Sequence, residues 1–285
     1  MRKITLFLIV FLVSAIAFAQ ESDNNKVVKK ETTGNFRATR LIYGRTAQTS
    51  KKGTLDFRIS HRFGRFSEGF EEYFGLDTAF VRIGVDYGIT ENLTVGFGRT
   101  KMNKEFDLTA MYRILKQSSD NGNMPVSLTA FGGVMLNTVD IKNSDIDFSD
   151  RLSTILQIFV SKEFFNRFAV QAAPVWVYNV SSPNPDNGHH IFSVGLGGRV
   201  KIAKHMSVNV EYYPMFSGNK FEGTTSPLAV SVDFDTRGHT FQLFVGNSMA
   251  PNEHLALINT TDKWTKGQLH FGFNLVRMFN VAPQK

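Results

Sequence analysis

Residues 80–100, FVRIGVDYGITENLTVGFGRT, decide the fold of this chain. On either side of a short turn at 89–92, apolar residues alternate with polar residues or glycines. Side chains of a strand point alternately to its two faces, so the stretch predicts two strands, each with an apolar and a polar face. The apolar positions are Val81, Ile83, Val85, Tyr87, Leu93, Val95 and Phe97.

The same alternation continues from Gly53 almost to the end of the chain. It predicts about twelve strands, whose lengths are close to the roughly 9–11 residues with which a tilted strand crosses a bilayer. An even number is usual for single-chain bacterial outer-membrane barrels, and ten or fourteen strands stay open as alternatives. We expect strands at residues 54–63, 78–88, 92–100, 105–116, 125–137, 151–162, 167–179, 190–202, 206–216, 227–235, 239–248 and 267–279.

The connections between these strands alternate in length. Those after the second, sixth, eighth and tenth strands are short, and those after the first, fifth, seventh, ninth and eleventh are longer. Short periplasmic turns that alternate with long external loops are typical of outer-membrane barrels. The connections at 117–124 and 101–104 fit this pattern less well.

The polar face distinguishes a membrane barrel from a soluble one. A soluble barrel packs apolar side chains inward, whereas this chain alternates an apolar Leu, Val, Ile and Phe face with a face of small and charged residues that suits a hydrated lumen. The sequence therefore predicts an all-β protein, a closed antiparallel up-and-down transmembrane β-barrel, and a soluble secreted barrel is the alternative. The predicted lumen-lining residues are Arg58, Arg62, Arg82, Asp86, Asp107, Arg113, Arg199, Glu211 and Asp233.

The N-terminus predicts export. Residues 1–19 carry Arg2 and Lys3, then an apolar run and a small-residue cleavage pattern, as a signal peptide does; a single membrane anchor would need a longer run. Residues 20–52 form a polar tail, partly disordered or bound to the rim, and 53–285 form the barrel. Within the tail, the apolar residues 41–43 would enter the lumen, pair with the rim or belong to a plain linker. The expected location is the outer membrane.

Composition excludes several function classes. The 285 residues include no cysteine, which excludes thiol catalysis, disulfides and cysteine–zinc sites. The mean hydropathy of -0.14 excludes a polytopic helical membrane protein. The net charge of +7 comes from scattered basic residues without a nucleic-acid motif, so we expect no nucleic-acid partner. We also predict no cofactor and no metal site, because the acidic loop with Asp140, Asp145, Asp147 and Asp150 lacks the EF-hand glycine.

Three functions stay open. The inward charges, with Asp56 and Arg58 beside Asp86 and Arg82, would line a passive pore for small solutes or lipophiles, or lock a closed structural or binding barrel through ion pairs. A lipid-modifying enzyme is the third, because His61 lies on the apolar face near the external end of the first strand. We expect no enzyme, since no outward serine partner is evident.

Two blocks carry a family resemblance: GTLDFRISHRFG at 53–64 and FGLDTAFVRIGVDYGITENLTVGFGR at 74–99. They resemble an uncharacterised family of bacteroidete outer-membrane β-barrel proteins, a domain of unknown function. The resemblance implies a Gram-negative outer-membrane location and carries no functional residues. It also implies outer-membrane lipid and the barrel-assembly machinery as partners. Such barrels commonly end on an aromatic residue, and here Phe279 is followed by six further residues.

Overall fold

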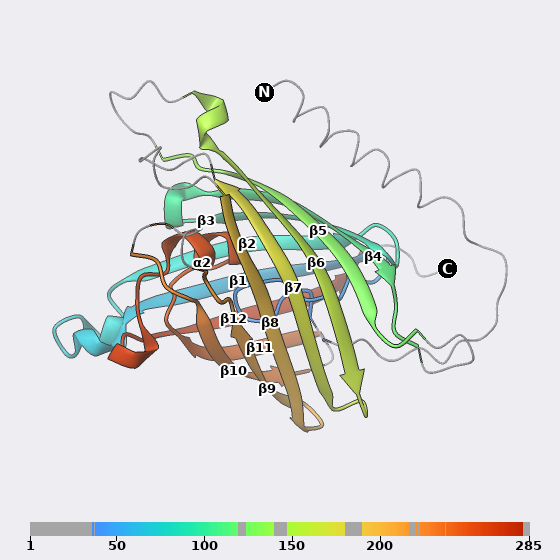
Figure 1. Cartoon of the computed structure of the whole chain (residues 1–285). Helices are drawn as coiled ribbons and strands as arrows, with labels where there is room; N and C mark the ends of the chain where they lie inside the picture. Colours follow the sequence, from blue (N-terminus) through green and yellow to red (C-terminus); the bar gives the residue numbers. More distant parts are fainter. Residues whose placement is uncertain are drawn as a thin grey trace.

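A computed structural model describes residues 36, 38–118, 124–139, 147–179, 190–216, 221, 223–236 and 238–281. Its strands form one closed antiparallel barrel in which each strand pairs with its sequence neighbours and β1 pairs with β12 (Figure 1). The predicted all-β, up-and-down barrel of twelve strands is therefore confirmed. The predicted signal peptide, residues 1–19, lies outside the described residues.

The strand bounds follow the predicted ones closely. The largest difference is in the ninth strand, which ends at Tyr212 and not at residue 216. The strands are β1 (Thr54–Arg65), β2 (Ala79–Gly88), β3 (Leu93–Thr100), β4 (Phe106–Leu115), β5 (Ser127–Leu136), β6 (Leu152–Phe164), β7 (Phe168–Asn179), β8 (His190–Ala203), β9 (Met206–Tyr212), β10 (Leu228–Asp235), β11 (His239–Gly246) and β12 (His270–Asn280).

The two-residue period appears directly as burial. Along β1 and β5 every second residue is buried, and the residues between are partly exposed. The exposed set on the outer surface includes large apolar side chains, such as Ile83, Phe97 and Leu108, the last 63% exposed. An outer surface of this kind suits lipid contact, because exposed apolar groups in water would be unfavourable.

Helical segments are short. In the described residues the helices are η1 (Phe66–Glu68), η2 (Tyr73–Gly75), η3 (Met102–Lys104), η4 (Phe148–Arg151), α2 (Glu253–Asn259) and η5 (Trp264–Lys266). None of the helices in the described part of the chain is long and apolar enough to span a membrane. All six belong to connections at one end of the barrel, which we call the long-loop end; the other is the short-turn end (Figure 1).

The segment before β1 lies inside the barrel. We call residues 38–52 the plug. It forms a hairpin whose arms meet at the Arg40–Arg45 bridge, and its tip, residues 41–44, is closed by a hydrogen bond from Leu41 N to Gly44 O of 2.8 Å. Its last residues stay at the short-turn end, where Lys52 bridges to Gly88. Of the three positions that the sequence leaves open for residues 41–43, the lumen is the one observed.

Helix α2 fills the lumen from the opposite end. Asn252 caps the helix by accepting a hydrogen bond from Leu255 N, 2.9 Å long, and residues 253–257 are buried. Leu255 and Ala256 pack in one cluster with Leu41, Ile42 and Tyr43 of the plug. Plug and α2 therefore meet inside the barrel.

The inner wall is not polar throughout, and here the sequence prediction is incomplete. One side, formed by β4 to β8, carries a cluster of buried apolar residues that points inward. Those strands are apolar on both faces over part of their length, so alternation does not reveal their inward residues. The wall members of this cluster are Met111, Phe131, Met135, Ile155, Phe159, Ala173, Val175, Val177 and Ile191.

The outward face gives a direct stability test. Ile158 lies at the middle of β6 and is 43% exposed, while Phe164 ends the same strand. In phospholipid vesicles, Ile158→Arg should lower the free energy of unfolding by about 2–4 kcal/mol and Phe164→Arg by only about 0–1 kcal/mol, because the cost of a charge falls toward the lipid boundary. Denaturant titration measures both. Equal effects would contradict a lipid-facing exterior.

Candidate functional site

The plug tip surrounds the carboxylate of Glu211 on β9. Ile42 N and Tyr43 N donate to Glu211 Oε2 at 2.9 and 2.7 Å, and Gly44 N donates to Oε1 at 2.9 Å. The Tyr213 hydroxyl adds a fourth donor to Oε1 at 2.9 Å. Consecutive N–H groups of a turn form a concave site for an anion, and charged acceptors strengthen each bond. Glu211 is therefore the anchor of the tip.

The carbonyl groups of the tip point to the other side of the lumen, toward β1, β11 and β12. Ile42 O accepts from Arg58 Nη2 at 3.4 Å, Arg62 Nη2 at 3.2 Å and Asn274 Nδ2 at 3.4 Å. Among the described ion pairs, none includes Arg58 or Arg62. The buried guanidinium groups of Arg58 and Arg62 thus share a peptide oxygen of the plug as hydrogen-bond acceptor, where a carboxylate would be expected.

Gln242 extends the same side of the tip site. Its Nε2 donates to Leu41 O at 2.8 Å. The tip thus presents its donors to an acid on β9 and its acceptors to bases and amides on β1, β11 and β12. The complementarity fixes the orientation of the turn within the lumen.

Two ion pairs hold the arms of the plug. Arg45 Nη1 lies 2.7 Å from Asp86 Oδ1 on β2, and Arg40 Nη1 lies 2.8 Å from Glu253 Oε2 on α2. Thr39 Oγ1 also donates to Asp86, at 2.9 Å. Burial lowers the pKa of the Arg40 guanidinium and the nearby Arg45 lowers it further, while Glu253 raises it. The pair with Glu253 connects the plug to α2.

The plug backbone next to Arg45 is bound by side chains of the wall. Gln171 on β7 accepts from Ala47 N at 3.2 Å and donates to Arg45 O at 2.9 Å. Thr129 on β5 donates to Ala47 O at 2.7 Å. Buried peptide groups need partners, and here the wall supplies them with side chains and not with strand backbone.

Arg82 and Asp107 form an ion pair of the wall itself. Arg82 Nε and Nη2 donate to the two oxygens of Asp107 at 2.8 and 2.6 Å, across β3. Gly98 makes room for this contact, because a Cβ there would lie 2.0 Å from Arg82 Nη2. Asp56 lies opposite Asp86 on the neighbouring strand, as expected. The described ion pairs are different ones, however, because Arg82 pairs with Asp107 on β4 and Asp86 with Arg45 of the plug.

The other predicted residues lie nearer the short-turn end. Arg113 donates to Asn92 Oδ1 and to Glu91 O, Arg199 lies 3.5 Å from Asp235, and Asp233 accepts from Gln242 at 2.7 Å. Of the nine predicted lumen residues, four contact the plug by the bonds described above, and five contact other parts of the wall or its turns. A pore-lining role for them stays a prediction.

Sequence reasoning missed part of the plug site. Gln171, Thr129 and Glu253 contact the plug without having been predicted as site residues. Thr129 lies on the polar face of its predicted strand, and a rule that admits neutral amides and hydroxyls on inward faces would have found it. Glu253 lies in a loop, where alternation gives no signal.

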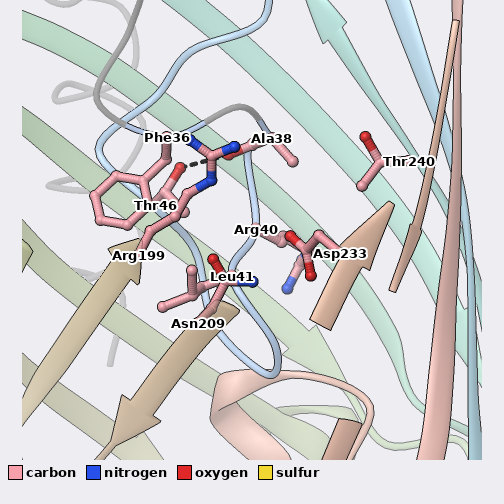
Figure 2. Close-up of a pocket in the computed structure, with 9 residues that line it drawn as sticks. All are labelled: Phe36, Ala38, Arg40, Leu41, Thr46, Arg199, Asn209, Asp233 and Thr240. Atoms are coloured by element: carbon pink, nitrogen blue, oxygen red, sulfur yellow. Dashed lines mark hydrogen bonds between the residues drawn. The ribbon is translucent and has the colours of Figure 1, made fainter. Parts of the chain in front are cut away.

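A small cavity with a volume of about 10 Å³ lies beside the plug. Figure 2 shows Arg40, Leu41 and Thr46 of the plug beside Asn209 and Asp233 of the wall around it. Such a volume holds about one water molecule. A solute larger than water therefore does not fit in this cavity.

His61 and the acidic loop were the other candidates. The His61 ring lies on the outer surface, 5.1 Å from Phe273 and 4.5 Å from Phe63 between ring centroids, and its buried Nδ1 has no described hydrogen bond. In the acidic loop, Asp147 caps η4, whereas Asp140 and Asp145 lie outside the described residues. The described residues contain no cluster of His, Cys, Asp or Glu that would hold a metal.

Comparison with known proteins gives a family match. A family model described as "Membrane bound beta barrel domain (DUF5777)" matches residues 36–279, which include the whole plug and all of the barrel strands except the last residue of β12. The predicted resemblance to a barrel family of unknown function is confirmed, and the bacteroidete origin stays a prediction. No curated protein matches the chain.

Several solved structures are similar in fold. An outer-membrane channel from Pseudomonas putida F1 is 14% identical, with a TM-score of 0.49, over 82% of this chain and 98% of that one. The KdgM porin is 9% identical, with a TM-score of 0.48, over 79% and 99%. The outer membrane phospholipase A from Escherichia coli is 10% identical, with a TM-score of 0.44, over 90% and 94%.

The tip contact predicts a large effect of one substitution. Glu211→Ala removes the acceptor of four buried donors, so it should lower the free energy of unfolding by about 3 kcal/mol or more. Glu72→Gln, at an exposed loop position, serves as the control and should change stability by less than about 0.5 kcal/mol. Thermal or denaturant unfolding in detergent measures both. Similar stability of the two variants would show that the tip contact adds nothing.

Proposed function

Because the chain belongs to the family of membrane-bound β-barrel domains, we propose that it is an outer-membrane channel for small polar solutes, with the plug as its gate. The observation that carries this proposal is the way the plug is held. Its peptide groups and both arginines bind polar groups of the wall and of α2. Water or a polar solute offers the same kinds of partner, so withdrawal exchanges hydrogen bonds and does not lose them outright.

The attachment of the plug supports a gate. The segment continues directly into β1 at the short-turn end, where Lys52 bridges to Gly88 and Thr49 donates to Glu91 O. A hairpin held at one end of a barrel can leave the lumen without breaking any strand pair. The space it vacates is lined by Asp86, Glu211, Arg58 and Arg62, which suits a hydrated path.

The fold and the N-terminal prediction together support an outer-membrane location. Export by the signal peptide at residues 1–19 would bring the chain to the barrel-assembly machinery and then to outer-membrane lipid. With short turns in the periplasm, the plug would enter from the periplasmic side and α2 from outside. The plug would then be accessible from the periplasm, and α2 from outside the cell.

A closed structural barrel is the second candidate, and one observation favours it. The apolar wall of β4 to β8 packs against Leu257 and Ile258 of α2 and against Ala47 of the plug. Apolar contacts of this kind are lost when the segments move, so they favour the closed state. Conductance distinguishes the two candidates.

Arg45→Ala tests the gate. The substitution removes the ion pair with Asp86 and the hydrogen bond to Thr109 Oγ1, 2.7 Å long, so the plug should leave the lumen more often. In planar bilayers we expect at least a tenfold higher open probability than for the unaltered chain. Arg65→Ala, which loses only contacts to Asp262 and Glu68, is the control and should leave conductance unchanged. If the Arg45→Ala barrel is folded but does not conduct, the proposed channel function is wrong.

A disulfide gives the converse test, because the chain has no cysteine of its own. Ala47 and Thr129 are joined by a 2.7 Å hydrogen bond between plug and wall. Ala47→Cys with Thr129→Cys, added to the Arg45→Ala variant, should abolish conductance when oxidised and restore it after reduction. Either single cysteine is the control. Unchanged conductance in the crosslinked barrel would mean that ions do not pass where the plug lies.

A further inference from the structure

The lumen binds its plug as a peptide. Three consecutive N–H groups of the tip meet Glu211, and the carbonyls of Leu41 and Ile42 meet Gln242 and the arginines of β1. These hydrogen bonds involve main-chain groups of the plug, so they would form with any peptide that makes the same turn. The wall therefore offers a surface that recognises peptide backbone.

The same site also selects side chains. Asp86 takes the guanidinium of Arg45, and Glu253 takes that of Arg40. The two basic positions lie at either end of the turn and are five residues apart in sequence. Carboxylates at both places would repel an anionic ligand and favour a basic one.

Space in the wall matches these groups. At Gly246 a Cβ would lie 2.0 Å from the Tyr43 hydroxyl, and at Gly197 it would lie 2.9 Å from Leu41 Cδ2. At Gly96 it would lie 2.8 Å from Arg45 Nη2. The inward glycines of three strands are thus the places where plug side chains approach the wall. The site is shaped for a turn with apolar residues between two basic ones.

We propose that the lumen is a binding site for short basic peptides, and that the plug occupies it in place of such a ligand. The proposal rests on the channel function proposed above and names its solute class. A single guanidinium compound would satisfy Asp86 or Glu253 and leave Glu211 without its three backbone donors. A peptide with the spacing of Arg40 and Arg45 satisfies all three acids at once.

The test uses the full chain with a weakened plug. Arg40→Ala with Arg45→Ala removes both ion pairs from the plug side and leaves Asp86, Glu211 and Glu253 intact. The probe is the synthetic peptide ATRLIYGRTA, the sequence of residues 38–47, and the control peptide is ATALIYGATA. Binding is measured by the rise in melting temperature and by block of conductance. We expect the probe to act at a concentration at least tenfold lower than the control.

The outcomes separate the proposal from the channel function. Conductance without block or thermal shift by the probe would overturn the peptide site and leave the channel standing. Absence of conductance would overturn the channel, while the thermal shift still decides on the peptide site. Equal block by the control peptide, or by argininamide at the probe's concentration, would also overturn the peptide site. If the double variant does not fold, Arg40→Ala alone takes its place, because it keeps the Arg45–Asp86 pair and loses only the ion pair with Glu253 and a 3.5 Å hydrogen bond to Tyr43 O.

Discussion

The carboxylate of Glu211, with three peptide N–H groups of the plug around it, is the interaction on which the interior of this barrel depends. A buried charge costs several kcal/mol unless it is paired or fully hydrogen-bonded. The tip of the plug supplies the bonds for Glu211, and in return the arginines of β1 bind the tip carbonyl. Neither the polar wall nor the plug would be satisfied in a dry lumen without the other. The closed state is therefore one mutually dependent arrangement.

Glycine on the inner face makes that arrangement possible. Charged side chains are long, and a closed barrel has a fixed width, so space must be left opposite each of them. Gly98 lets Arg82 reach across β3 to Asp107, and Gly96 lets Arg45 reach Asp86. The alternation of glycine with Arg or Asp in the sequence around 80–100 is thus a packing pattern as well as a face pattern.

The alternation of residue types was enough to predict the strands, their number and the inward face of β1 to β3. It failed for strands that are apolar on both faces, because the method needs one polar face. Phe131 and Ile155 point inward from strands that are also apolar outside, so the sequence carries no period to separate the faces. The plug lies beyond any strand pattern, and Leu41, Ile42 and Tyr43 look alike whether they enter the lumen or lie on a rim. The partners of Arg82 and Asp86 depended on which neighbours were glycine and on a segment outside the sheet. Contacts of that kind follow from three-dimensional packing and not from local sequence.

The two sides of the barrel interior hold the plug and α2 by different kinds of contact. The side formed by β4 to β8 is apolar and packs Leu257 of α2 against Met135 and Val177 in one cluster. The side formed by β1, β2 and β9 to β12 carries most of the hydrogen bonds and ion pairs to the plug, and Thr129 of β5 and Gln171 of β7 add further hydrogen bonds. Phe244 of β11 also packs in one apolar cluster with the plug tip. Burial of apolar groups is lost when they move into water, whereas polar groups exchange one partner for another. On withdrawal the arginines and peptide groups of the plug would exchange partners, whereas Leu41, Ile42 and Tyr43 would lose their burial. The Arg40–Glu253 ion pair joins the plug to α2, which enters the lumen from the long-loop end.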